Sequence, residues 1–498
     1  MRFLKAAALA AALFFCASDL SAQQYLSASE KSFVIGVGRD FYEGSDSRGY
    51  LHGSTGMWEA LTYLDETMTP VPWLAESWES QDSNQRWVFR LRDKILFHDG
   101  SRLSAGDVVE SMKRIMKNPR YDPAGSLSYV ESVKTYGDRG VAFTLSRPLP
   151  HFPKLVAYYG SPVFKPECFD DMGRIKEPVA TGPYRLKKVL QGSRLSLAAF
   201  NGHWNGVPPY EELVFMSIPD AQTRAMALIA GQIEAVADVG GILPEQEKPL
   251  QRNPNLLLKK TEVATTHLLV FNCARPPFSS TETRLWVSGV IDRGKLLDVF
   301  AKEAGVAAAD PYTPMAKEYA FGLIKPSRHP MPSEIRNYKQ KITIILHGAT
   351  LQRWPYKDIA QALQALLQVH GLKVEIRIME QGSFHDSIKA GRFDVALQPY
   401  TLMTGDPDFF YSYWMLSDAP RNCGWRNPDA DRLINEARHE ADGQRRKDLY
   451  RKLQEMLNQY LPLLPLYHDV ALYAHRKEVR CFQMDHFFKP VLKVKGCE

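Results

Sequence analysis

The chain has 498 residues, of which 45% are apolar and 24% are charged, an ordinary composition for a soluble globular protein. A chain of this length predicts roughly two to four folded units. The net charge of +6 is mild, and the Lys and Arg residues are scattered. Nucleic-acid binding is therefore disfavoured, because it needs a basic stripe that follows the phosphates.

The first 22 residues have the pattern of a secretory signal peptide. Two basic residues precede an apolar run over 6–15, and small residues lead to Ala22, where we predict cleavage. The apolar run is too short to span a bilayer. A lipid anchor at Cys16 is disfavoured because the bulky Phe15 stands where lipoprotein signals have a small residue. These features predict export to the periplasm.

Cysteines give no sign of a metal site. Those that remain after cleavage are far apart and form no C-x-x-C pair. An exported protein can form disulfides, and an odd number leaves at least one thiol free or paired between chains. Cys481 and Cys497 are the closest pair and could tie down the C-terminus, although the connectivity stays open. The cysteines concerned are Cys168, Cys273, Cys423, Cys481 and Cys497.

The N-terminal part of the mature chain reads as strands and loops. A strand is predicted over 31–39, rich in β-branched residues, before a Gly/Ser-rich loop over 42–56. Alternating apolar residues in 86–100 predict a half-buried strand, and a second short strand is predicted to end at the His98-Asp99-Gly100 turn.

Two helices have clear start signals. Ser104 with Asp107 three residues later resembles a capping box, and apolar residues follow at helical spacing. Asp220 caps a second predicted helix that stops at Gly231, with a strand directly after it. Between these helices, 180–200 predicts a Gly-Pro turn and a β-hairpin.

The C-terminal half has the strand–helix–strand order of α/β units. Strands are predicted over 341–348, 372–379 and 393–400, a helix over 356–371, and a long helix followed by a buried strand over 443–470.

The stretch TLMTGDPDFF (401–410) is then the loop after a strand. Asp406-Pro407-Asp408 could be a plain turn, but ligands in open α/β sheets bind beyond the carboxyl ends of strands, which favours a functional loop.

Catalytic and metal motifs are missing from the sequence. There is no G-x-S-x-G elbow, no H-E-x-x-H and no phosphate-binding loop. The histidines are dispersed singly, and only His52, in the Gly/Ser-rich loop, is placed near a ligand. We therefore predict no catalytic residue, no resident metal and no cofactor.

Several ordered blocks resemble the family 5 extracellular solute-binding proteins, the receptors of bacterial ABC importers for peptides, nickel chelates and related solutes. The blocks are 70–115, 180–186, 218–236 and 268–296, followed by GDPDFF and the long helix before LPLLPLYH. The resemblance implies an α/β, two-lobe periplasmic binding protein fold of type II-like topology with an extra inserted subdomain. It also implies a non-enzymatic, monomeric receptor that closes on its ligand and delivers it to the transmembrane subunits of an ABC permease.

The resemblance also implies domain limits. The first lobe would comprise 24–47, 176–268 and 482–498, the inserted subdomain 48–175, and the second lobe 269–481. The hinges would lie near Phe271-Asn272 and near Arg480-Cys481.

The family's ligand determinants match only in part. In the peptide receptors an Asp four residues before the Pro of D-P-x-x-F binds the peptide's amino terminus, and Met403 stands there in this chain. The nickel receptors place a His directly after Asp-Pro, where this chain has Asp408. They also use an Arg of the insert, and the matching segment 158–166 has none. The predicted ligand residues are Tyr50, Leu51, His52, Tyr121, Tyr400, Met403, Thr404, Asp406 and Asp408.

The resulting hypothesis is a receptor for a peptide or peptide-like small solute, with a nickel or other metal-chelate receptor as the alternative. A less favoured alternative is an exported hydrolase that uses Asp406 and Asp408 as paired carboxylates. A third is a receptor retained as a signalling or adhesion module.

Overall fold

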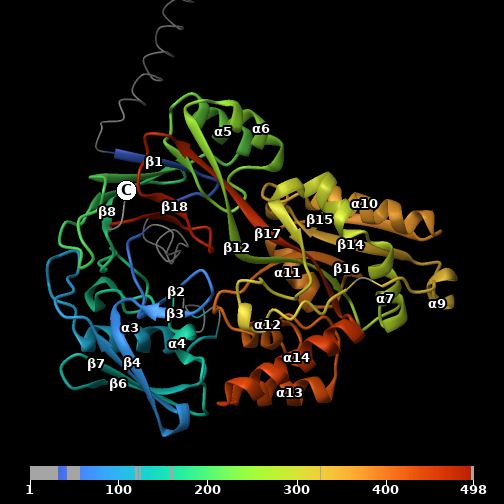
Figure 1. Ribbon diagram of the computed structural model, residues 1–498, viewed down its shortest axis with the longest axis horizontal. Helices are drawn as coiled ribbons and strands as arrows, with labels where there is room; N and C mark the ends of the chain where they lie inside the picture. The colour runs from blue at the N-terminus through green and yellow to red at the C-terminus, as the bar shows by residue number, and fades with distance from the viewer. Residues whose placement is uncertain are drawn as a thin grey trace, which may run out of the picture.

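The computed structural model describes residues 32–41, 56–117, 122, 125–157, 161–325 and 327–494. The predicted signal peptide lies outside these residues, as do four predicted ligand residues, Tyr50, Leu51, His52 and Tyr121. Figure 1 shows two α/β halves side by side, with a smaller part built around its own sheet below the first half. Within the described part of the chain, no helix is long and apolar enough to cross a membrane.

One mixed sheet of 11 strands runs through both halves, in the order β15-β14-β16-β12-β17-β11-β1-β10-β9-β8, with β13 paired to β17. Its strands are β1 (Ser32–Val37), β8 (Tyr184–Leu190), β9 (Arg194–Ala199), β10 (Glu212–Ser217), β11 (Ala235–Val236), β12 (Leu256–Phe271), β13 (Gly305–Ala307), β14 (Lys341–His347), β15 (Lys373–Met379), β16 (Val395–Thr401) and β17 (Leu463–Arg476).

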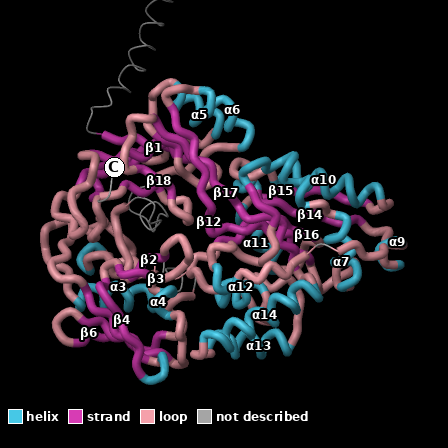
Figure 2. The backbone as a smooth tube through the Cα atoms, viewed as in Figure 1, coloured by secondary structure: helices cyan, strands magenta, loops and turns pink. Residues whose placement is uncertain are grey.

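The two longest strands, β12 and β17, connect the halves. They run antiparallel and side by side from the first half into the second (Figures 1 and 2). The first part of β12 pairs with β17 alone, whereas 265–271 also pairs with β16 of the second half. Their register shifts twice, between Glu262 and Thr266 and between His267 and Leu268, which locates the irregular stretch of the crossing.

The first lobe packs helices α5 (Ala221–Ile229) and α6 (Glu247–Arg252) on its strands. The predicted helix start is confirmed, because the carboxylate of Asp220 accepts a hydrogen bond from Thr223 N at 2.7 Å. The predicted hairpin is confirmed as β8 and β9. The strand predicted after Gly231 shortens to the two residues of β11. The C-terminal strands β18 (Phe482–Met484) and β19 (Pro490–Leu492) return to this lobe, where Phe482 packs on Phe33.

The inserted part has a separate four-stranded sheet in the order β4-β5-β7-β6. Its elements are β2 (Thr62–Leu64), β3 (Pro70–Pro72), β4 (Ala75–Gln81), β5 (Arg86–Leu91), α3 (Ala105–Lys117), β6 (Val130–Tyr136), β7 (Gly140–Leu145) and α4 (Phe152–Leu155). The capping box is confirmed, since Ser104 and Asp107 each bond the other's backbone N–H. The short strand predicted before His98 is wrong: Leu96 makes one isolated bridge, and the buried His98 ring bonds Gly182 O at 3.0 Å instead.

The second lobe surrounds β14, β15 and β16 with helices, as predicted for α/β units (Figure 2). These are α7 (Thr281–Val290), α8 (Arg293–Leu296), α9 (Ser333–Arg336), α10 (Tyr356–Val369), α11 (Gln381–Lys389), α12 (Pro407–Trp414), α13 (Pro428–His439) and α14 (Gly443–Tyr460). The long helix before the final buried strand is confirmed as α14, and that strand, β17, extends further than predicted. Helices α13 and α14 lie toward the inserted subdomain in Figure 1.

Candidate functional site

The loop after β16 leads directly into helix α12. Asp406 is the N-cap of this helix: its carboxylate accepts a hydrogen bond from Asp408 N at 3.0 Å, and Pro407 takes the first helical position. A helix start therefore explains the Asp-Pro pair better than a plain turn does. The sequence held this signal, because Asp at the N-cap and Pro at the next position are typical of helix N-termini.

The Asp406 carboxylate is fully buried and is already paired. Arg446 donates to its two oxygens at 2.8 and 2.9 Å. Burial acts to raise the pKa of this carboxyl, but the positive charge of Arg446 outweighs burial and holds the pKa far below its usual range. Arg446 also donates to the hydroxyl of Tyr319 at 2.8 Å. The pair thus joins α12 to the start of α14.

Asp408 has a separate arginine. The Nε of Arg438 lies 2.9 and 3.1 Å from the two carboxylate oxygens of Asp408. Ser412 Oγ donates to the same carboxylate at 2.9 Å. Burial acts to lower the pKa of Arg438, yet the carboxylate of Asp408 raises it above the ordinary value. Neither carboxylate of the loop is left without a cationic partner.

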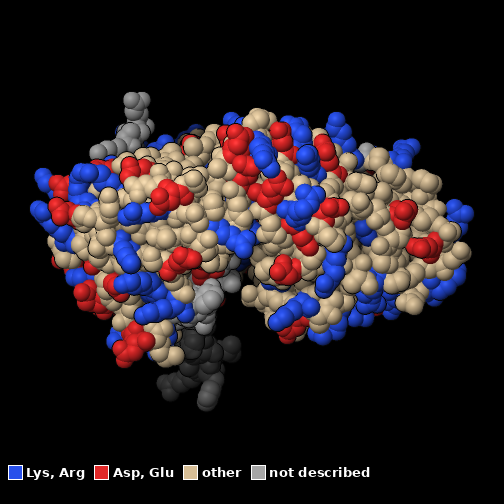
Figure 3. All heavy atoms as spheres, turned by 90° about the horizontal axis from the view of Figure 1, so that it is seen from below, with Lys and Arg blue, Asp and Glu red and all other residues tan. Residues whose placement is uncertain are grey.

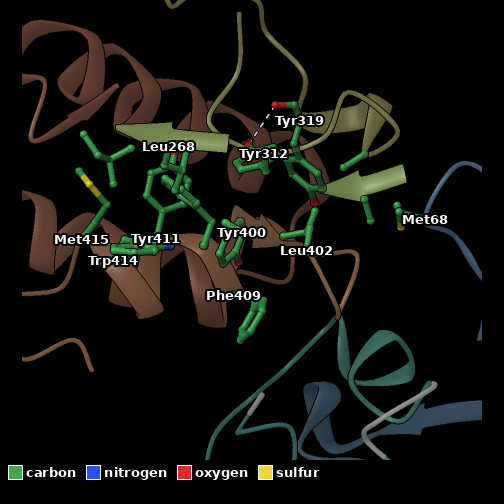
Figure 4. Packing of buried hydrophobic residues seen from close by; sticks show 14 of the residues in the cluster. Met68, Leu268, Tyr312, Tyr319, Tyr400, Leu402, Phe409, Tyr411, Trp414 and Met415 are labelled. Atoms are coloured by element: carbon green, nitrogen blue, oxygen red, sulfur yellow. Dashed lines mark hydrogen bonds between the residues drawn. The ribbon is translucent and has the colours of Figure 1, made fainter. Parts of the chain in front are cut away.

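Tyr400 lies near the end of β16, and Met403 and Thr404 lie on the loop that follows. Tyr400 is buried against Phe409 (Figure 4), with ring centroids 5.6 Å apart, and against Phe410 at 5.3 Å. Burial raises the pKa of its hydroxyl. Met403 packs on the edge of this aromatic cluster. The buried Thr404 accepts a hydrogen bond from the backbone N–H of Asp406 at 3.4 Å. Their predicted contact with a ligand stays a prediction.

The inserted subdomain reaches across to this loop. Arg446 Nη2 lies 3.1 Å from Nδ1 of His151, and Lys154 Nζ donates to Gly405 O at 3.2 Å. Because the arginine donates, this ring nitrogen of His151 must accept. Burial lowers the pKa of His151 to about 4, which favours the neutral ring. Burial also lowers the pKa of Lys154.

A second polar contact joins the same two parts. Arg438 Nη1 donates to the hydroxyl of Tyr129 at 2.7 Å, and Nδ1 of His439 bonds Pro148 O at 2.8 Å. The rings of Tyr129 and His439 meet edge to face at 5.7 Å. The insert therefore contacts α13 as well as α14.

Apolar contacts continue the same interface. A Cβ on Gly405 would lie 3.0 Å from atoms of both Leu64 and Met68 of the insert. Met68 and Leu402 belong to one buried cluster with Tyr400 (Figure 4). The insert and the second lobe thus share a continuous core. On the face seen in Figure 3, basic and acidic side chains are interspersed over both halves.

The first lobe itself touches the second at another point. Gly240, in the loop after β11, has a φ of +61° and packs on the backbone of Arg353. A Cβ at this position would lie 2.5 Å from Arg353 Cα and 2.8 Å from Arg353 O. Only glycine fits such an approach without a shift. The lobes therefore meet at this point and through the insert, in addition to the crossing strands.

The predicted hinge residues lie at or after the C-terminal ends of β12 and β17 rather than at the two register shifts between these strands. Phe271 is buried in a cluster of the second lobe, and the side chain of Asn272 donates to Gly391 O and Phe393 O at 2.9 and 2.8 Å. Cys481, directly before β18, is disulfide-bonded, and its carbonyl oxygen accepts from Lys493 N at 2.8 Å. Their role in a motion stays a prediction.

A cavity of about 300 Å³ lies between the first lobe and the insert. Glu59 on its wall accepts hydrogen bonds from His203 at 3.2 Å and from the indole of Trp204 at 3.1 Å. Asp485 accepts from the hydroxyl of Tyr63 at 3.1 Å. No group of three metal-ligating side chains occurs among the described residues. The walls include Trp58, Glu59, Tyr63, Glu66, Trp73, His203, Asp485 and Lys489.

The family model described as bacterial extracellular solute-binding proteins, family 5 Middle, matches residues 69–422. The chain belongs to this family. Family 5 proteins are solute-binding receptors and not a family of enzymes. The chain is 25% identical over 472 residues to the dipeptide-binding protein of Escherichia coli (strain K12), covering 85% of this chain and 86% of that protein. It is 26% identical over 454 residues to the periplasmic oligopeptide-binding protein OppA of Salmonella typhimurium, covering 84% and 82%.

Solved structures of other family 5 receptors share the fold. NikA from Brucella suis in complex with Fe(III)-EDTA superposes with a TM-score of 0.83 at 21% identity, over 93% of this chain and 100% of that one. The dipeptide binding protein from Pseudoalteromonas sp. SM9913 in complex with Met-Leu gives a TM-score of 0.78 at 20% identity, over 93% and 99%. The predicted two-lobe α/β fold of this family 5 protein is confirmed.

Proposed function

We propose that this family 5 protein is the receptor of an ABC importer that captures a peptide or peptide-like small solute between its lobes and delivers it to a membrane permease. The observation that carries the proposal is the pair of long strands β12 and β17, which join two lobes whose edges touch elsewhere. Such a connection allows closure around a ligand. The peptide-binding relatives support the solute class.

The loop after β16 does not offer the ligand a free carboxylate. Asp406 and Asp408 are each paired with an arginine, and Met403 is uncharged. A ligand ammonium buried there would have no anion to compensate its desolvation. The same pairing argues against a hydrolase that uses these two carboxylates as acid and base. We expect the cationic end of a ligand to bind elsewhere.

The cavity beside the crossing offers such a place. His486 O accepts from Ala264 N of β12 at 2.8 Å, which holds Asp485 and the cavity wall next to the crossing strands. The described wall carries three carboxylates, Glu59, Glu66 and Asp485, against two ammonium groups, those of Lys489 and Lys493. Glu59 and Asp485 already accept hydrogen bonds, and Glu66 is exposed. We propose Glu66 as a contact for the positive group of the solute.

Binding of defined ligands tests the proposal. Thermal unfolding should be measured with dipeptides, tripeptides and their N-acetylated forms, and with nickel–histidine mixtures. A peptide at about 100 times its Kd should add about 2.7 kcal/mol to the free energy of unfolding. Glu66→Gln should weaken binding of the free-amine peptide but not of the acetylated one, and Glu131→Gln, an exposed insert residue outside the cavity, is the matched control. If no peptide raises the melting temperature, the solute class is wrong.

A metal-chelate receptor is the second candidate. The block 218–246, including GGILPEQ, is similar to that of the nickel receptors, and its Gly240 forms the contact with Arg353. A stabilising effect of nickel–histidine, with none from peptides, would favour this candidate.

A further inference from the structure

Two cysteines of the second lobe meet although they are 150 residues apart in sequence. Cys273 follows the end of β12, and Cys423 lies in the loop before α13. Their Sγ atoms are 3.9 Å apart, and Cys273 N donates to Cys423 O at 2.7 Å. Both side chains are free thiols in the structure.

The two cysteines lie in matching Asn-Cys-small turns. The side-chain oxygen of Asn272 accepts from Ala274 N at 3.1 Å, and that of Asn422 accepts from Gly424 N at 2.7 Å. Each asparagine bends its backbone in the same way, so that each thiol points into the space between the turns. This repeated turn is a stronger sign of pairing than the thiol distance alone.

Both turns are held in place by further contacts. The amide of Asn422 donates to Leu416 O and Trp425 O, both at 2.8 Å, and the Asn272 amide is similarly bound within the second lobe. Gly424 has a φ of +84°, and a Cβ there would lie 2.6 Å from the Ala274 Cβ. The backbones thus pack directly on each other, and only small side-chain movements are needed to join the sulfurs.

The two thiols differ in their chemistry. Burial raises the pKa of Cys273, whereas the hydrogen bond from Cys273 lowers the pKa of Cys423. Cys273 is half-buried and Cys423 is buried, so an oxidant reaches Cys273 first. Cys423 is then the sulfur placed to resolve a mixed disulfide on Cys273.

We propose that Cys273 and Cys423 are an oxidation site that forms an intrachain disulfide by exchange with a low-molecular-weight or protein disulfide. Cys273 loses its thiol proton and attacks one sulfur of the oxidant, which stays bound to it as a mixed disulfide, while the other oxidant sulfur takes up a proton and leaves as a thiol. Cys423 then loses its proton and attacks Cys273 Sγ, and the oxidant sulfur bound there takes up a proton and leaves as the second thiol. Two protein thiols lose two electrons and two protons in total, and the oxidant gains them as two thiols.

The disulfide would link the segment that follows β12 to the loop before α13. Helix α13 carries Arg438, which holds Asp408, and its neighbour α14 carries Arg446, which holds Asp406. A covalent link at this point would keep the second lobe together as one unit while the crossing strands bend. The expected effect is on the stability of the second lobe.

Peptide mapping of the folded full chain tests the site directly. The reduced protein is incubated with oxidised glutathione, quenched in acid, unfolded, alkylated and digested for mass spectrometry. The peptides of Cys273 and Cys423 should be recovered joined to each other. Cys168, which is buried and free in the insert, should be recovered alkylated. Recovery of Cys273 and Cys423 as separate alkylated or glutathione-bearing peptides would overturn the proposal.

Thermal unfolding supplies the second measurement. Closing so long a loop should raise the melting temperature of the oxidised wild-type protein by roughly 5–10 °C over the reduced form. Cys273→Ser should lose most of this difference, and what remains measures the bond at Cys481. Cys168→Ser is the matched control and should keep the full difference. An equal difference in wild type and Cys273→Ser would contradict a stabilising bond at this site.

Discussion

Asp406 and Arg446 form a buried bidentate ion pair that joins the N-cap of α12 to the start of α14. The side chains are 1% and 5% exposed, so neither charge has water as an alternative partner. The hydroxyl of Tyr319 and Nδ1 of His151 lie around the same guanidinium. This cluster connects the loop after β16, the long C-terminal helix and the inserted subdomain.

Replacing Arg446 should lower the free energy of unfolding far more than replacing an exposed arginine of the same helix. Arg446→Met leaves the Asp406 carboxylate buried without a counter-charge, and we expect a loss of about 3–5 kcal/mol in the free energy of unfolding. Guanidinium unfolding followed by circular dichroism measures it. Arg445→Ala, in the exposed ion pairs next to it, should cost at most about 1 kcal/mol. Equal losses in the two variants would show that the buried Asp406–Arg446 pair stabilises the protein no more than an exposed ion pair does.

Acid should weaken the contact made by His151. Its pKa is about 4 in the folded protein and 6.5 in an unfolded chain, so between these values only the unfolded chain binds the proton. Stability therefore falls as pH drops below 6.5, by roughly 1–2 kcal/mol at pH 5 for this residue. His151→Gln should show a smaller loss between pH 7.5 and 5 than wild type. The exposed His370→Gln should keep the wild-type slope.

Local signals predicted most of the framework. The caps at Ser104 and Asp220, the hairpin β8–β9 and the strand–helix–strand order of the second lobe all follow from contacts within a few residues. The short strand predicted before His98 is wrong because a contact with a distant residue decides the structure there. The segment is apolar enough for a strand, but its histidine is bound by Gly182, more than 80 positions away.

The site was harder to predict because its partners are distant in sequence. The sequence predicts Asp406 and Asp408 as ligand contacts, which stays a prediction, and it does not show that their arginines lie 40 and 30 residues later on helices where arginine is common. Nothing in the spacing marks Arg446 or Arg438 as different from the exposed Arg445. Only the fold brings each carboxylate to its arginine. Once paired, the two carboxylates of the loop are not free to bind a cation, and they link α12 to α13 and α14.

The approach of Gly240 to Arg353 should be intolerant of a side chain. Gly240→Ala adds a Cβ 2.5 Å from Arg353 Cα and should force the lobes apart, giving a larger radius of gyration in small-angle X-ray scattering. The control is Gly322→Ala, because Gly322 has a similar φ of +63° but no atom within 4 Å. Both variants carry the backbone cost of about 1–2 kcal/mol for a left-handed conformation. A separation seen in both, or in neither, would mean that the Gly240 contact does not hold the lobes together.

The Tyr129 hydroxyl should slow the opening of the lobes. It accepts from Arg438 where the insert meets the second lobe, and because the site is partly exposed we assign this bond the contribution of an ordinary hydrogen bond, about 0.5–1.5 kcal/mol. We expect the open form to lose this bond, so that Tyr129→Phe raises the release rate of a bound peptide about 2–10-fold, with little change in its association rate. Stopped-flow displacement of a fluorescent peptide measures both rates. Tyr136→Phe, on an insert tyrosine that is 49% exposed, is the control and should leave them unchanged. An unchanged release rate in Tyr129→Phe would show that the insert contact persists in the open form.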